Sequence, residues 1–82
     1  MNRDEVFDIV CSAISEVLSI KKEDITGNMR FMHEINLDSI DVTELMMIAE
    51  EEFDLQELMA DDIMDIVTVD DAVEFVMSKK KN

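Results

Sequence analysis

Residues 38–53 read DSIDVTELMMIAEEEF, a pattern that predicts an amphipathic helix. We expect this helix to begin at Asp38-Ser39, because Asp38 is a good N-cap and Asp41 occupies the capping-box position three residues later. Apolar residues at helical spacing form the expected buried stripe: Val42, Leu45, Met46, Ala49 and Phe53.

Three apolar residues of the same helix fall outside this stripe. Ile40, Met47 and part of Ile48 lie on a face that also carries acidic side chains. One interpretation is an exposed apolar line flanked by the carboxylates of Asp41, Glu44 and Glu51. The alternative is that Met47 and Ile48 only widen the face that packs on the core.

Toward the N-terminus, the sequence predicts a loop and then another helix. Residues 23–37 read as a long loop with a turn at 26–28, where Thr-Gly-Asn is a strong turn signal. Five apolar residues should hold this loop on the core: Ile25, Met29, Phe31, Ile35 and Leu37. The periodicity before the loop predicts a helix from about Arg3 to Leu18, with Asn2 and Glu5 as its N-terminal capping pair.

Toward the C-terminus, we expect a short helix around Asp61 to Ile66 and a longer one that starts after Thr68, with Asp71 at its capping-box position. The apolar face of the last helix comprises Val69, Ala72, Val73, Val76 and Met77, with Phe75 partly outside it.

The absence of proline and the single glycine disfavour a turn-rich sheet domain. The predicted fold is all-α: a small four-helix bundle, with three main helices, a short third helix and a long loop between helices one and two. We expect residues 1–82 to form a single domain.

The charge of the chain is large and unevenly distributed. The formal net charge is -14, and residues 31–76 contain fifteen Asp or Glu and no Lys or Arg. Binding to nucleic acid or to an anionic membrane is disfavoured, because both need basic side chains. The charge favours a basic protein partner. The alternative is an acidic surface that serves only solubility.

Cysteine content and targeting signals both favour the cytoplasm. The single Cys11 cannot form an internal disulfide and lies on the apolar face of the first helix, which suits a reducing compartment. The sequence lacks an apolar run long enough to span a bilayer, and its start does not read as a signal peptide. The chain is expected to be monomeric and not to insert into membranes.

The sequence contains few residues for conventional catalysis. Its one histidine, His33, lies in the predicted loop and reads as a bystander, while Cys11 reads as core. There is no His/Cys cluster for zinc, no EF-hand pattern and no glycine-rich phosphate loop. We therefore expect no enzymatic activity and no dedicated metal site.

Ser39 has the most distinctive position of any reactive side chain. It is expected to be the first residue inside a helix, where backbone N–H groups lack partners and its hydroxyl should be exposed. A phosphodiester there would gain roughly 0.3–1 kcal/mol from the helix dipole. The adjacent acids oppose this gain, so a modifying enzyme would have to supply the selectivity.

The run Asn36-Leu37-Asp38-Ser39-Ile40-Asp41 resembles the Asp-Ser-Leu attachment motif of acyl carrier proteins. The similarity continues through 44–45 and 50–53, through the loop segments 24–26 and 31–35, and through 68–69 and 72–73. It therefore extends over nearly the whole chain in the right order. Ile40 stands where the family usually has Leu, Asn36 where a small residue is common, and Ala49 where Leu is frequent.

The resemblance implies a carrier that an enzyme modifies from coenzyme A. Ser39 would bear a covalent 4'-phosphopantetheine arm, whose thiol holds acyl intermediates as thioesters for fatty-acid or related lipid or polyketide biosynthesis. A phosphopantetheinyl transferase and acyl-processing enzymes with basic patches would be its partners. The residues implied to contact them are Asp38, Ile40, Asp41, Glu44, Met47, Glu50 and Glu51.

The acyl chain could also be sheltered between the helices of such a carrier. Four methionines would make the core easier to open: Met46, Met47, Met59 and Met64. Two alternatives stay open at this stage. The chain could carry a specialised acyl or aminoacyl cargo, or it could be an unmodified acidic interaction module.

Overall fold

The computed structural model describes residues 2–35, 37–56, 58 and 60–80, except for the side chains of residues 33, 34 and 60. Its elements are α1 (Arg3–Leu18), the 3-10 helix η1 (Lys22–Asp24), the π-helix η2 (Phe31–Ile35), α2 (Ser39–Glu52), α3 (Ala60–Ile63) and α4 (Val69–Lys80). Within these ranges the only extended pairing is an isolated antiparallel bridge between Arg30 and Thr68. The all-α prediction is confirmed.

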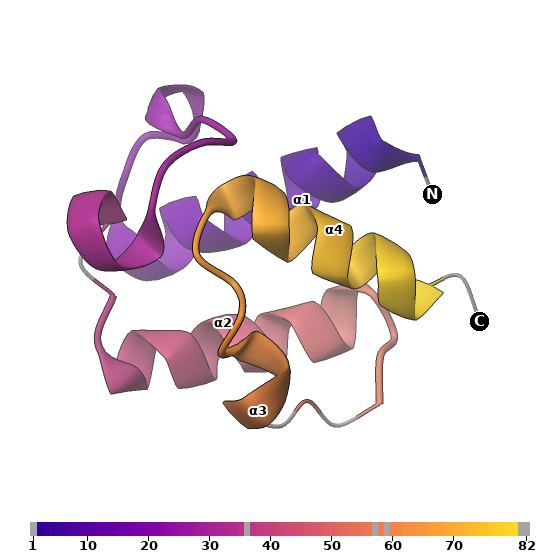
Figure 1. Cartoon of the computed structure of the whole chain (residues 1–82). Helices are drawn as coiled ribbons and strands as arrows, with labels where there is room; N and C mark the ends of the chain where they lie inside the picture. Colours follow the sequence, from indigo (N-terminus) through magenta and orange to yellow (C-terminus); the bar gives the residue numbers. More distant parts are fainter. Residues whose placement is uncertain (1, 36, 57, 59, 81–82) are drawn as a thin grey trace.

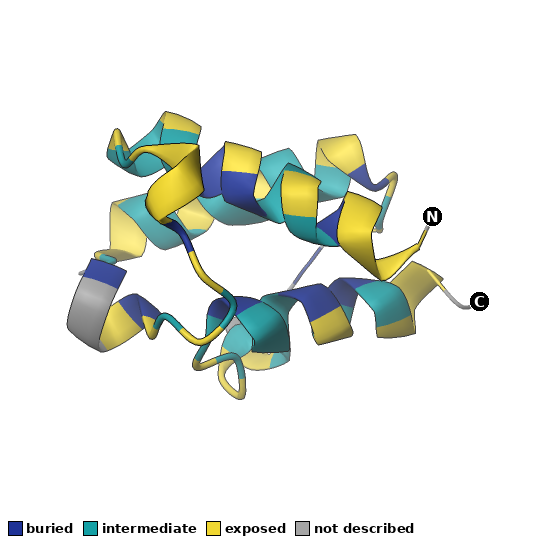
Figure 2. Cartoon of the chain, turned by 90° about the horizontal axis from the view of Figure 1, so that it is seen from above, coloured by how far each residue is buried: buried dark blue, intermediate teal, exposed yellow. Residues whose placement is uncertain are grey.

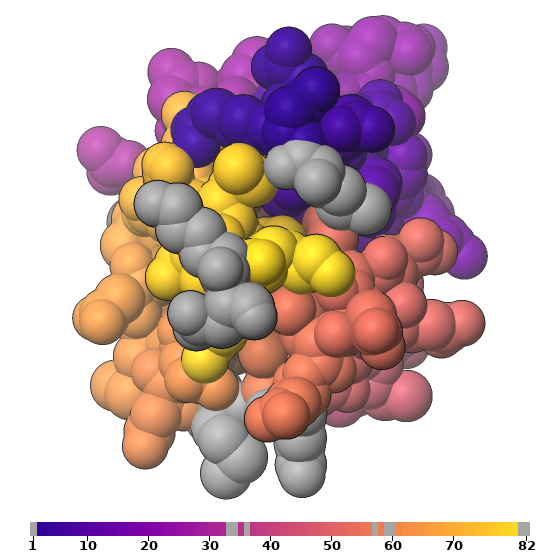
Figure 3. All heavy atoms as spheres, turned by 90° about the vertical axis from the view of Figure 1, so that its right-hand side faces the viewer, coloured from indigo at the N-terminus to yellow at the C-terminus, as the bar shows by residue number. Residues whose placement is uncertain are grey.

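Three long helices enclose the core (Figure 1). α1 runs antiparallel to both α2 and α4, packs against both, and makes the main contacts between helices. Seen from the right of Figure 1, the start of α1 and the ends of α2 and α4 meet on one face (Figure 3). Ser39, at the start of α2, lies at the opposite end of the bundle.

The first helix matches its sequence prediction. Its N-terminus is closed by a capping box, in which the Asn2 side chain accepts from the Glu5 backbone N–H at 2.9 Å and Glu5 accepts from the Asn2 backbone N–H at 3.0 Å. Ser19 ends the helix in a left-handed conformation, with φ of 57°. The buried residues of this helix are Val6, Cys11, Ala13 and Ile14.

Residues 23–37, predicted as a loop, contain two short helical segments. η1 overlaps its start and η2 occupies 31–35, so the prediction of an irregular segment was incomplete. The expected turn is present at residues 27–28. Ile25, Phe31 and Ile35 are buried, and Met29 and Leu37 pack against the same cluster, as predicted.

Backbone hydrogen bonds tie this loop to the start of α4. Phe31 donates to the carbonyl of Val67 at 3.0 Å, and Val69 donates to that of Met29 at 3.0 Å. This pairing at residues 67–69 accounts for the end of α3 at Ile63, before the predicted Ile66. A helix that continued to residue 66 would break this pairing.

Buried side chains form two clusters. The ribbon of Figure 2 shows the buried positions in dark blue along the helices and the loop. The loop-end cluster comprises Cys11, Ile14, Ile25, Phe31, Ile35 and Val69. The terminal cluster comprises Val6, Phe53, Val73 and Val76. No residue of α2 itself is fully buried, so the predicted stripe of this helix faces the core without being closely packed in it.

The N-terminus of α4 has the second capping box. Thr68 accepts from the Asp71 backbone N–H through its hydroxyl at 3.1 Å, and the Asp71 carboxylate accepts from the backbone N–H groups of Thr68 at 3.1 Å and Val67 at 3.0 Å. The hydrogen bond from the Thr68 backbone, and then that from Val67, hold the pKa of Asp71 below its usual value. The predicted cap is confirmed.

Replacing Asp71 by Ala should lower the free energy of unfolding at neutral pH by roughly 1 kcal/mol, because the cap is lost. Since the pKa is lower in the folded state, the contribution of Asp71 is present above the pKa of the unfolded chain, about 3.9, and is lost as pH falls. The difference between wild type and Asp71→Ala, measured by urea denaturation, should therefore shrink below about pH 4. Asp65→Ala, which removes an equal but exposed charge, is the control. A difference that stays constant down to about pH 3 would contradict the assignment.

Candidate functional site

Ser39 is the first residue of α2 and is exposed. Asp38 adopts extended backbone, with φ of -103° and ψ of 178°, and its carboxylate accepts from the Asp41 backbone N–H at 2.8 Å. This N-cap fixes the point at which the helix begins. The Ser39 hydroxyl has no hydrogen-bond partner among the described residues, so it stands open at a helix N-terminus.

One exposed face of α2 alternates apolar and acidic side chains. Ile40, Glu44, Met47 and Glu51 follow one another at spacings of four, three and four residues, and all four are exposed. The exposed fractions of Ile40 and Met47 are 69% and 61%. This decides between the two interpretations for Met47, which belongs to the surface, while Ile48 is half-buried and lines the core side.

The remaining predicted contact residues have different surroundings. Asp38 is exposed beside Ser39, and Asp41 is half-buried one turn into the helix. Glu50 is turned toward the segment after α2, where its carboxylate accepts from the backbone N–H of Leu58 at 2.7 Å. This structural role of Glu50 has no local signal in the sequence, because Glu50 is the first of three consecutive glutamates.

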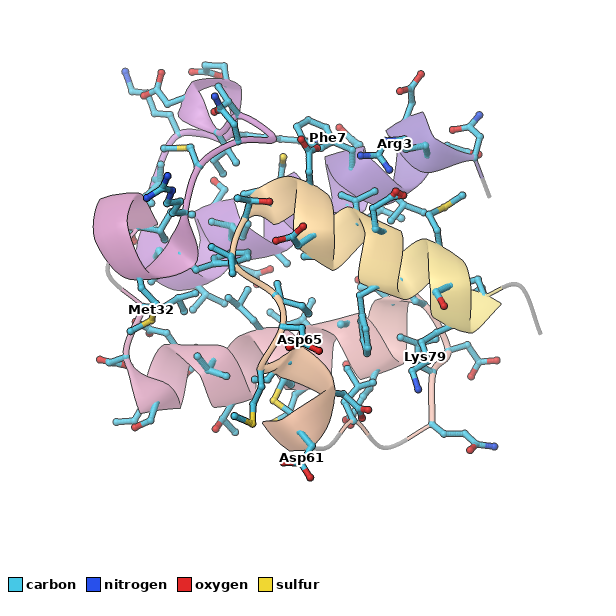
Figure 4. All side chains as sticks on the ribbon, in the orientation of Figure 1. Arg3, Phe7, Met32, Asp61, Asp65 and Lys79 are labelled. Carbon is cyan, nitrogen blue, oxygen red and sulfur yellow. The ribbon has the colours of Figure 1, made fainter. Side chains whose placement is uncertain are left out.

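Several basic side chains are engaged away from this face. Arg3 forms ion pairs with Asp70 at 3.3 Å and Glu74 at 2.8 Å, and so joins α1 to α4 (Figure 4). Lys22 pairs with Asp8 at 2.6 Å. At the end of α4, Lys79 lies over the Phe75 ring and Lys80 donates to the carbonyl of Phe53 at 2.9 Å. The α2 face therefore keeps its negative charge uncompensated by these four residues.

A cavity of about 460 Å³ lies between α2 and the rest of the bundle. Its lining is almost entirely apolar and comes from α1, η2, α2, α3 and α4. The residues of α2 and its C-cap that line it are Val42, Leu45, Met46, Ile48, Ala49 and Phe53. Because the space lies under α2, this helix can present its side chains to the core without any of them being fully enclosed.

The cavity reaches the protein surface. Two of its lining residues, Met32 in η2 and Met64 just after α3, are 70% and 76% exposed. Met32 lies beside the start of α2, near the end that carries Ser39 (Figure 4). Met46 and Met64 therefore line the cavity, as the sequence suggested. Met47 does not line it and is exposed on the outer face of α2. Met59 lies outside the described residues.

Sequence reasoning missed several lining residues of the cavity. Met32 and Phe75 line it, although Met32 received no role and Phe75 was expected partly outside the apolar face. Leu58 and Ile63 contribute from the segment between α2 and α4. No periodic signal marks them, since they meet only when the chain folds.

The other candidate reactive residues do not join this site. Cys11 is buried in the loop-end cluster as predicted, and burial raises the pKa of its thiol. The side chain of His33 lies outside the described residues. Within the described ranges, no group of three or more His, Cys, Asp or Glu is arranged to hold a metal ion, and no helix combines the length and apolar content that crossing a bilayer requires.

Comparison with known proteins gives a consistent picture. Residues 8–76 match the family described as phosphopantetheine attachment site. The chain is 38% identical over 80 residues to an acyl carrier protein of Prochlorococcus marinus (strain MIT 9515), and 39% identical over 80 residues to one of Borreliella burgdorferi (strain ZS7). Each alignment covers 98% of this chain and 99% of the relative.

A solved structure shares the fold as well. It is that of an acyl carrier protein from Enterococcus faecalis, which is 33% identical to this chain and superimposes with a TM-score of 0.76. The match covers 96% of this chain and 99% of the other.

The hydrogen bond of Glu50 leads to a stability prediction. Glu50→Ala should lower the free energy of unfolding by about 1 kcal/mol, because the Leu58 N–H loses a charged acceptor. Glu51→Ala removes the same charge from the exposed face and should leave stability unchanged or slightly raised. Thermal unfolding monitored by circular dichroism measures both. Equal effects of the two variants would show that the hydrogen bond does not stabilise the fold.

Proposed function

The chain belongs to the acyl carrier protein family, and we propose that Ser39 is the residue that carries its 4'-phosphopantetheine arm. The observation that carries this proposal is the exposed hydroxyl of Ser39 at the capped start of α2. An esterifying enzyme can reach this oxygen, and the helix N-terminus favours a phosphate, a gain that the adjacent Asp38 and Asp41 oppose. The protein is a carrier and not an enzyme.

Attachment follows from the chemistry of coenzyme A. The Ser39 oxygen forms a phosphodiester with the phosphate next to pantetheine, the bond between the two phosphates of coenzyme A breaks, and adenosine bisphosphate leaves. The transferase accepts the hydroxyl proton. When attached, the arm supplies a thiol that holds acyl groups as thioesters. Asp38 keeps the helix start in place during this step through its bond to the Asp41 N–H.

The acidic face of α2 is proposed as the surface that partner enzymes recognise. Members of this family work with a phosphopantetheinyl transferase and with acyl-processing enzymes. The exposed residues Glu44 and Glu51, with Asp38 at the helix start, would meet basic patches on these enzymes. Ile40 and Met47 would add apolar contact area between the charges. Charged contacts of this kind give fast, salt-sensitive association with modest affinity, which suits a shuttle.

Asp41 and Glu50 are assigned a smaller share of partner binding. Asp41 is half-buried, and Glu50 already accepts a hydrogen bond from Leu58. A carboxylate that already accepts a hydrogen bond within the protein contributes less to the binding of an approaching enzyme.

The cytoplasm is proposed as the location of the protein, in keeping with the free, buried Cys11. Fatty-acid or related lipid biosynthesis is proposed as its pathway. We propose that residues 1–82 act as one monomeric carrier domain.

The cavity is proposed to shelter the acyl chain between enzyme encounters. Burial of each methylene stabilises the enclosed state by up to about 0.8 kcal/mol. An acyl chain can therefore gain several kcal/mol in the apolar space under α2, while a partner must offset that gain to withdraw it. This balance protects the thioester and still allows delivery.

Attachment is tested by intact-mass measurement after incubation with coenzyme A and a phosphopantetheinyl transferase. Wild type should gain the mass of one phosphopantetheine group, and Ser39→Ala should gain none. Thr43→Ala, which removes an exposed hydroxyl one turn further along α2, should be modified like wild type. An unmodified wild type, or a modified Ser39→Ala, would reject the attachment site.

Partner recognition is tested by charge reversal. Glu44→Lys should slow association with the transferase several-fold at low salt, because an attractive charge becomes repulsive. Glu16→Lys makes the same change of charge on the exposed side of α1 and should have little effect. Stopped-flow or surface-plasmon measurements at two salt concentrations give both rates. Equal slowing by the two variants would mean that net charge, and not the α2 face, steers the encounter.

A further inference from the structure

The cavity follows α2 along most of its length. Its lining begins at Val42, one turn after Ser39, and continues to Phe53, the C-cap of the helix. Phe75 and Val76 of α4 also line the cavity, and both pack in the same terminal cluster as Phe53. From Val42 to Phe53 the helix rises roughly 16 Å, a length that about twelve carbon atoms of an extended acyl chain would fill.

Ala49 lies where the cavity passes from one buried cluster to the other. Leu45, one turn earlier, packs against the loop-end cluster, whereas Ala49 packs against the terminal cluster. Ala49 is also the smallest of the residues with which α2 lines the cavity, and it is only half-buried. Ala49 therefore adds only a methyl group to the lining between the half of the cavity near Ser39 and the half near Phe53.

We propose that Ala49 sets the length of acyl chain that this carrier shelters, by keeping the far half of the cavity accessible to chains of about twelve carbon atoms. This inference rests on the proposed attachment at Ser39. A larger side chain at position 49 would fill the passage with its own carbon atoms. The sheltered length would then end near position 49, which is four residues, or about 6 Å, before Phe53.

The substitution also has a consequence for the protein without cargo. Leucine at position 49 adds apolar atoms to a space that is otherwise unfilled, so Ala49→Leu should fold and should melt no lower than wild type. This expectation separates the effect on cargo from a general loss of structure. Ala49→Val fills less of the space and serves as a second variant.

The experiment attaches saturated acyl chains of increasing length, from butyryl to palmitoyl, with a phosphopantetheinyl transferase and the matching acyl-coenzyme A. Intact mass confirms each product, and circular dichroism gives its melting temperature. In wild type the melting temperature should rise with chain length and level off near twelve carbon atoms. In Ala49→Leu it should level off about four carbon atoms earlier, with Ala49→Val between the two.

The matched control is Ser12→Leu, which places the same side chain on an exposed position of α1, outside the cavity. Its levelling-off point should equal that of wild type. The role of Ala49 would be overturned if the melting temperatures of wild type and Ala49→Leu levelled off at the same acyl-chain length. It would also be overturned if Ser12→Leu shifted that length as much as Ala49→Leu does. A wild type that takes up no arm would overturn the attachment at Ser39 as well, and the mass measurement identifies that case.

Discussion

The firmest attachments of α2 lie at its two ends, whereas its middle packs through half-buried side chains such as Leu45 and Ala49. At its start, the Asp38 carboxylate caps the Asp41 N–H, and the Leu37 N–H donates to the carbonyl of Phe31 at 3.1 Å. At its end, Lys80 of α4 donates to the carbonyl of Phe53, and buried Phe53 anchors the C-cap in the terminal cluster. Between these anchors the helix lies over a cavity of about 460 Å³. A closely packed core would have no such space.

This mode of support lets one helix serve two purposes. Its inner side borders an apolar space that can hold a hydrocarbon chain, and its outer side carries the exposed sequence of Ile40, Glu44, Met47 and Glu51. Ser39 begins this helix, and Met32, an exposed residue of the cavity lining, lies beside the same end of α2 (Figure 4). A chain attached to Ser39 therefore has both an enclosed apolar environment and a partner surface within reach of the same helix. In the proposed function, the first would protect the cargo and the second would allow its release.

The distribution of charge follows the same division. Arg3 and Lys22 form ion pairs on the α1 side of the molecule, and Lys79 and Lys80 are engaged at the end of α4. The ion pairs of Arg3 and Lys22 are exposed, and each contributes little to stability. Their position matters more, because it leaves the acids of α2 facing outward without these cations as neighbours. A net charge of -14 destabilises the fold by self-repulsion. In the proposed function, the negative field of the α2 face would attract partner enzymes with basic patches.

Local features of this protein follow from its sequence alone. Helical spacing and capping residues identified α1, the starts of α2 and α4, the outward position of Ile40 and the exposure of Ser39, because these depend on residues within one or two turns of each other. Four other features depend on how the helices pack: the early end of α3, the hydrogen bond from Leu58 to Glu50, the contact of Lys80 with Phe53, and the cavity. These features join segments far apart in the chain or consist of space between them. No local pattern encodes either, since both arise only when the helices are packed against one another.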